Sequence, residues 1–214
     1  MSSRTRGTPV TANERRNARQ HARGLQRQRE IRRRQIRIAI WAGLAVAVAA
    51  VVAVLVLRGS QSQPGRTVPL QGNQHIGEGE QHVVYNTKPA TSGPHWSIGG
   101  RAPAPWGISK EPIPDEGMIH NLEHGGIAIQ YNCRECPELV TALEDFYQRY
   151  TSNPANRLPL YPGSTKIVVA PYYDMTSRIA LTAWGRIDTL DNYDEERMTR
   201  FIDAFRDKGP EKVP

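Results

Sequence analysis

The chain has 214 residues, of which 38% are hydrophobic, and a formal net charge of +7. This length allows one domain of ordinary size together with additional segments. The charge is uneven, because residues 1–37 contain twelve arginines and two glutamates, whereas residues 58–214 have a net charge of −3. The basic pI therefore arises from the N-terminal segment and does not indicate a nucleic-acid-binding domain. Nucleic acid is not expected as a partner.

Residues 1–37 are polar and Arg-rich, and we expect them to be disordered. The next twenty residues, 38–57, carry no charge, and a helix of this length spans about 30 Å, the thickness of a bilayer core. The alternatives are a buried soluble helix, which rarely lacks a polar face, and a cleaved signal peptide, whose apolar region is shorter. We therefore predict a single uncleaved transmembrane helix over 38–57, with the lipid bilayer as its partner.

The orientation of this helix follows from the arginines around it. Twelve arginines precede the helix and only Arg58 follows it directly. The positive-inside rule then places residues 1–37 in the cytoplasm and the C-terminal part outside it, as a single-pass protein of the cell membrane. Residues 58–71 contain Gly, Ser, Gln and Pro and are predicted to be a flexible linker. Residues 72–214 form the expected extracytoplasmic domain, which is near the commonest domain size.

Strands and helices alternate along the predicted domain. We expect strands at 82–85, 126–131, 166–170 and 179–184, helices at 137–150 and after Asp191-Asn192, and a long Pro- and Gly-rich loop over 88–116. The last helix would bury Met198, Phe201, Ile202 and Phe205. The predicted fold class is α/β or α+β, with a mixed sheet of about four to five strands and two main helices. A thioredoxin-like arrangement is one alternative.

Two histidines and a carboxylate lie within five positions of His120-Asn-Leu-Glu123-His124. The segment matches the H-x-x-E-H motif of inverted zincins, in which a long helix presents both histidines to zinc. Gly117 precedes the motif and Gly125 follows it, so we expect a helix of about two turns at most. This short helix argues against a zinc protease.

Other histidines occur in the same loop-rich half of the domain, notably His75 and His95. Imidazoles from separate loops suit copper or zinc. We predict a metal centre built on His120 and His124, with help from His95, Glu123 or His75. The alternative is that these rings donate hydrogen bonds that anchor the loops to the sheet.

Cys133 and Cys136 are the only cysteines of the chain. They lie between a predicted strand and a predicted helix, where a helix N-terminus would lower the pKa of a thiol and make it reactive. Outside the cytoplasm the same pair can form a permanent disulfide, which is the interpretation we favour. A redox-active pair and a metal-binding thiolate pair remain alternatives.

Several sequence segments together resemble one bacterial family. They are HIGEGE (75–80), TSGPHW (91–96), HNLEHGG (120–126), the two cysteines followed by PELV (137–140), VVAPYYDM (168–175), IALTAWGRID (179–188) and GPE (209–211). In these segments, which cover nearly all of 72–214, the chain resembles the domain of unknown function 3105 family. It is also similar to that family in its N-terminal membrane anchor. The resemblance implies no activity and no catalytic residue.

The sequence thus favours a copper- or zinc-binding module attached to the membrane, and leaves open whether it is an enzyme. The first alternative is a thiol–disulfide oxidoreductase that uses the cysteine pair. The second is a structural domain that binds another protein of the cell envelope.

Overall fold

A computed structural model describes residue 27 and residues 32–53 and 63–213, and the chain divides into two units, Met1–Ser62 and Gln63–Pro214. In the first unit, Arg32–Ala53 forms one helix that is long and apolar enough to cross a membrane, as a membrane anchor or a signal sequence would be. This helix begins before the predicted start at residue 38. The last predicted positions, 54–57, lie outside the described residues, as does most of the Arg-rich segment 1–37.

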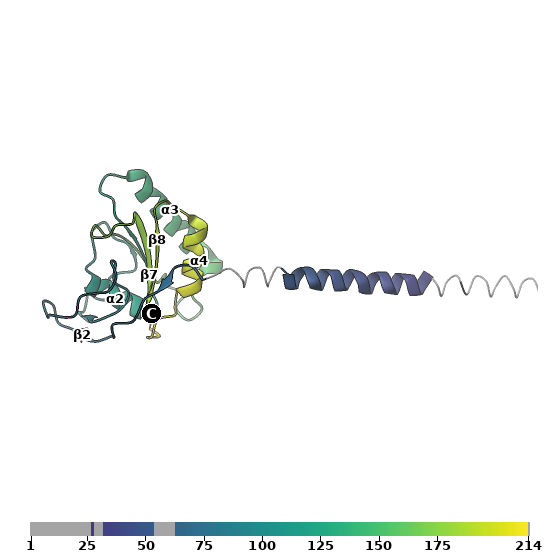
Figure 1. Ribbon diagram of the computed structural model, residues 1–214, viewed down its shortest axis with the longest axis horizontal. Coiled ribbons are helices and arrows are strands. Elements are labelled where there is room, and N and C mark those ends of the chain that lie inside the picture. Colours follow the sequence, from purple (N-terminus) through teal and green to yellow (C-terminus); the bar gives the residue numbers. More distant parts are fainter. Residues whose placement is uncertain (1–26, 28–31, 54–62, 214) are drawn as a thin grey trace, which may run out of the picture. The chain divides into compact units, whose positions relative to one another are not determined.

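The second unit is a mixed α/β domain, so the predicted fold class is confirmed. Its elements are labelled as in Figure 1. They are β1 (Arg66–Thr67), β2 (His75–Ile76), β3 (His95–Trp96), β4 (Gly107–Ile108), α2 (Asp115–Glu123), β5 (Ile127–Tyr131), α3 (Pro137–Ser152), the 3₁₀-helix η1 (Pro154–Asn156), β6 (Ile167–Pro171), β7 (Ile179–Ala183), β8 (Arg186–Leu190) and α4 (Glu195–Phe205).

Six strands form the main sheet in the order β1-β8-β7-β5-β6-β4, where four to five were expected. The strands β4, β6 and β5 run parallel to one another, whereas β5-β7, β7-β8 and β8-β1 pair in antiparallel fashion. Strand β1 falls within residues 58–71, which the sequence analysis assigned to a linker, and pairs there with β8. A separate parallel pair is formed by β2 and β3.

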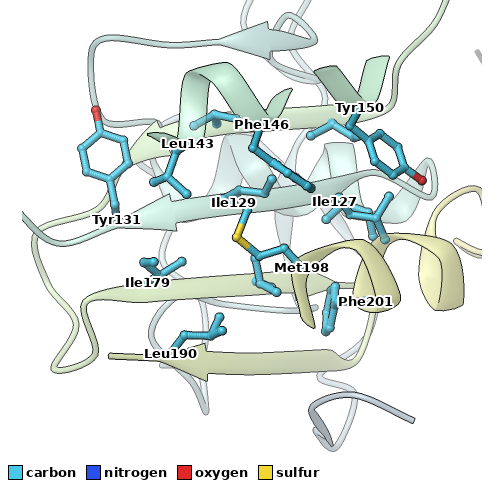
Figure 2. Close-up of a cluster of buried hydrophobic side chains, with 14 of the residues drawn as sticks. Ile127, Ile129, Tyr131, Leu143, Phe146, Tyr150, Ile179, Leu190, Met198 and Phe201 are labelled. Carbon is cyan, nitrogen blue, oxygen red and sulfur yellow. The ribbon is translucent and has the colours of Figure 1, made fainter. Parts of the chain in front are cut away.

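Alternation along the strands divides the core into two layers. Side chains of β5 such as Ile129 face α3 and α4, where they pack with Phe146 and Met198 (Figure 2). The preceding residue, Ala128, faces the other side of the sheet and packs with Met118 and Leu122 of α2. Helices therefore cover both faces of the sheet (Figure 1). The four residues expected to face inward from the last helix are all buried.

The structure corrects two details of the secondary-structure prediction. Residues 82–85 contain no strand, and Val83 and Val84 expose 57% and 88% of their surface. Two β-branched residues form a strand only where a neighbouring strand supplies hydrogen bonds and packing. The last helix is capped by Asp194, whose carboxylate accepts from the Arg197 N–H, and not by Asp191-Asn192.

Candidate metal centre

Three histidines from three segments meet beside the C-terminal half of α2. Strands β2 and β3 pair in a register that places His75 opposite His95, and His120 comes from α2. One ligand atom from each ring lies within 4.8 Å of the other two. The three side chains are thus placed so that they could hold a metal ion.

His95 is fully buried and fixed from both sides. Its Nδ1 lies 2.8 Å from the carbonyl of Gly93, so Nδ1 carries the proton and donates it, because a carbonyl can only accept. Its Nε2 faces the Glu123 carboxylate at 2.9 Å. Gly93 has φ 132°, and a Cβ there would lie 2.9 Å from the Tyr85 ring, so the turn that presents His95 requires glycine.

His120 has the same arrangement at Nδ1. This atom donates to the carbonyl of Trp96 at 2.5 Å, which leaves the Nε2 lone pair available to a ligand. Burial lowers the pKa of His120 below its usual value; the Trp96 carbonyl opposes this shift, and the neighbouring His95 and His75 strengthen it. The lowered pKa favours the neutral ring, which is the form that coordinates a metal.

Glu123 is the last residue of α2 and is fully buried. Its Oε2 lies 2.9 Å from Nε2 of His95 and 3.4 Å from Nε2 of His75, and its Oε1 has no hydrogen-bond partner among the described residues. When His75 and His95 are neutral and the proton of His95 is on Nδ1, the lone pair of His95 Nε2 faces a lone pair of the Glu123 carboxylate. Such a contact is favourable only when a proton or a metal ion lies between the two atoms.

The separations suit a small ion after a modest adjustment. Nitrogen ligands about 2.0–2.1 Å from a tetrahedral zinc are about 3.4 Å apart. The three histidine donor atoms, at up to 4.8 Å from one another, would have to approach by up to about 1.4 Å to reach this spacing. His75 is the ring best placed to move, because 47% of its side chain is exposed.

His124 lies next to this group but has a different partner. Its ring centroid is 4.6 Å from that of His120, and its Nε2 lies 3.4 Å from the carboxylate of Glu211. Burial lowers the pKa of His124, and its buried Nδ1 has no partner in the part of the chain that the structure describes. The sequence analysis put His120 and His124 at the centre, whereas the geometry groups His120 with His75 and His95. His82 lies elsewhere, 3.1 Å from Glu116.

The C-terminal segment holds the end of α2 in place. The N–H of Glu211 donates to the Glu123 carbonyl at 3.1 Å, and the N–H of Asp207 donates to the Gly125 carbonyl at 2.7 Å. The buried ammonium of Lys166 donates to the His124 carbonyl at 2.8 Å and to Asp207 at 2.7 Å. Sequence reasoning missed this support, although the GPE motif of the family resemblance contains Glu211.

The two cysteines lie at the opposite end of β5. Their sulfurs are at disulfide distance, with the Cα atoms of Cys133 and Cys136 6.0 Å apart. Cys136 is the N-cap residue of α3 and is buried, whereas Cys133 is half-buried. The five residues of β5 separate the cysteines from the histidines by about 16 Å, so the two groups form independent sites.

Fold and site together define a mixed α/β domain with a candidate histidine metal centre at the end of its helix α2. The chain belongs to the family described as protein of unknown function DUF3105, whose profile matches residues 76–214. This confirms the family resemblance noted in the sequence. No curated protein and no solved structure matches the chain.

Proposed function

We propose that the domain binds one copper or zinc ion through His75, His95 and His120, with Glu123 as the fourth ligand. The observation that carries the proposal is the group of three imidazoles, whose ligand atoms lie within 4.8 Å of one another beside the buried Glu123 carboxylate. Ligating histidines typically donate their second ring N–H to a carbonyl or carboxylate, which orients the ring. His95 and His120 each have such a carbonyl.

The donor types support this choice of ion. Imidazole nitrogen suits both copper and zinc, and three imidazoles with one carboxylate complete a four-coordinate site. The charges also agree, because a divalent ion would neutralise the Glu123 carboxylate, which is completely excluded from solvent. The competing account is that no metal binds and that a charged His95 forms a buried ion pair with Glu123, an arrangement that we call the proton-closed site.

Calorimetric titration of the full-length protein in detergent with Zn²⁺ and Cu²⁺ tests the proposal. We expect one ion per chain, with binding lost in His95→Ala and His120→Ala and retained in His82→Ala. His82 is the matched control, because it also has one ring nitrogen on a carbonyl and the other near a carboxylate. The absence of binding at micromolar protein, with destabilised His95 and His120 variants, would favour the proton-closed site.

For the cellular setting, we propose that the helix Arg32–Ala53 is an uncleaved anchor in the lipid bilayer. The N-terminus then lies in the cytoplasm and the domain lies outside. The arginines that precede the apolar run support this orientation. A reporter that is active only outside the cytoplasm, fused after Pro214, should be active. Activity of a cytoplasm-only reporter at the same position would contradict the orientation.

Thiol–disulfide exchange is a second candidate function, favoured by the position of Cys136 at the N-terminus of α3. A helix N-terminus stabilises a thiolate and so favours the reduced pair. Cys133 is the more exposed of the two residues, and its sulfur would be the one attacked. A redox titration tests this activity, in which the protein is equilibrated in redox buffers and its free thiols are then alkylated. A reduction potential above about −220 mV supports exchange, and one below about −300 mV indicates a permanent disulfide.

A further inference from the structure

A cavity of about 310 Å³ lies on the side of α2 near Trp96, apart from the histidines. Its walls include the aromatic and aliphatic residues Trp96, Trp106, Ile108 and Ile113, together with Arg101 and Gly117. This volume is at the lower end of the range for pockets that bind small molecules. Most of the lining residues are apolar, but about half of the wall surface is polar, and Arg101 is the one cationic residue among those that line it.

Gly117 is an unusual residue for this position. It lies inside α2, where glycine is less favourable to the helix than alanine. A Cβ at Gly117 would meet nothing nearer than 3.5 Å in the described part of the chain, the nearest atoms being Ile113 Cγ2, the Arg101 carbonyl oxygen and Trp96 Cε3. Close packing therefore does not require glycine here. The effect of the missing side chain is to keep this part of the cavity open.

Arg101 supplies the charge at this cavity. Its guanidinium lies 5.3 Å from the centroid of the Trp96 ring and 2.5 Å from the Glu78 carboxylate. Both side chains of this ion pair are about half exposed, at 51% and 55%. Exposed ion pairs contribute little to stability, so the guanidinium can exchange Glu78 for the anionic group of a ligand. Guanidinium binds carboxylates through two parallel hydrogen bonds.

We propose that this cavity binds a small aromatic anion, with its ring among Trp96, Trp106 and Ile113 above Gly117 and its acidic group on Arg101. Aromatic walls favour a flat ring, because ring contacts contribute beyond the buried area alone. The site adjoins the histidine cluster through Trp96, whose carbonyl accepts a hydrogen bond from Nδ1 of His120. It does not depend on metal binding, because none of its lining side chains belongs to that cluster.

The test uses 4-fluorophenylacetate as the probe and ¹⁹F NMR of the full-length protein in detergent. We expect broadening of the fluorine signal that unlabelled phenylacetate reverses. Gly117→Leu, which fills the cavity, should weaken binding at least tenfold, whereas Gly163→Leu should leave it unchanged, since a Cβ at Gly163 meets no described atom within 4 Å. Gly117→Ala should also weaken binding, and it provides a variant that removes the helix cost of glycine and so retains the fold.

The charged group is tested with Arg101→Gln and the neutral analogue 4-fluorophenylacetamide. We expect Arg101→Gln to weaken binding of the carboxylate probe about fivefold, which corresponds to about 1 kcal/mol, and to leave the affinity for the amide unchanged. No reversible broadening in the wild-type protein at millimolar probe would overturn the proposal. Equal binding to wild type and Gly117→Leu would also overturn it, as would equal loss of carboxylate and amide in Arg101→Gln.

Discussion

The change His120→Ala gives a quantitative test of the metal centre. If the metal binds only the folded protein, a free-ion concentration of one hundred times Kd stabilises it by about 2.7 kcal/mol. For a folded unit such as Gln63–Pro214, each kcal/mol raises Tm by about 2–4 °C, so the metal should raise Tm by about 5–11 °C.

Removal of His120 should nearly abolish this shift. Loss of even an outer partner of a ligand weakens binding by about 10–100-fold, so loss of a ligand should weaken it by at least about 100-fold. At the same ion concentration, Kd then equals or exceeds the free ion, and the stabilisation falls to about 0.4 kcal/mol or below, a shift of about 1 °C. The apo protein also loses the hydrogen bond to Trp96, so each variant is compared with its own metal-free melt.

The assay is tryptophan fluorescence during thermal unfolding of the full-length protein in detergent, with and without Zn²⁺ or Cu²⁺. His82→Ala is the matched control and should keep the whole metal-induced shift, because His82 interacts with Val83 and Glu116 outside the cluster. Equal metal-induced shifts in wild type and His120→Ala would refute the assignment of His120 as a ligand.

Three further predictions concern other features of the domain. Burial lowers the pKa of His120, so the folded protein binds fewer protons there than the unfolded chain, and the stability of the metal-free protein should fall as the pH drops below about 6.5. Equal free energies of urea unfolding at pH 5.5 and pH 7.5 would contradict this. Cys133 and Cys136 should escape alkylation in non-reduced protein, as judged by mass spectrometry, and two labelled thiols would count against the disulfide. Lys166→Met should lower the free energy of urea unfolding by about 1.5–3 kcal/mol, because the hydrogen bonds of Lys166 are buried. Lys88→Met removes an exposed ion pair and should lower it by at most about 1 kcal/mol, and similar losses in the two variants would contradict this distinction.

The elements with a clear hydrophobic period were predictable from the sequence. The buried run of β5 and the helical spacing of α3 were placed within two residues of their observed bounds. Strand β8 was not predicted, because Arg186 and Asp188 interrupt its apolar pattern; Asp188 is nevertheless buried, since Arg197 donates two hydrogen bonds to it. Two-residue strands such as β2 have no periodicity to detect.

The site was predictable in its residue types but not in its grouping. His75, His95, His120 and Glu123 were all among the candidates, because imidazoles and carboxylates are rarely placed together for packing alone. Their arrangement depends on the register between β2 and β3, which pairs His75 with His95, and on no local pattern. The support of α2 by the C-terminal segment likewise depends on contacts between residues more than eighty positions apart.

X-ray absorption spectroscopy of the zinc-loaded full-length protein tests the metal centre most directly. The account predicts three imidazole nitrogens and one carboxylate oxygen, all about 2.0–2.2 Å from the ion. In His75→Ala, one imidazole fewer should be bound to the ion. A zinc–sulfur distance of about 2.3 Å would assign the ion to Cys133 and Cys136, and a shell of water oxygens alone would show that the histidine cluster does not hold it.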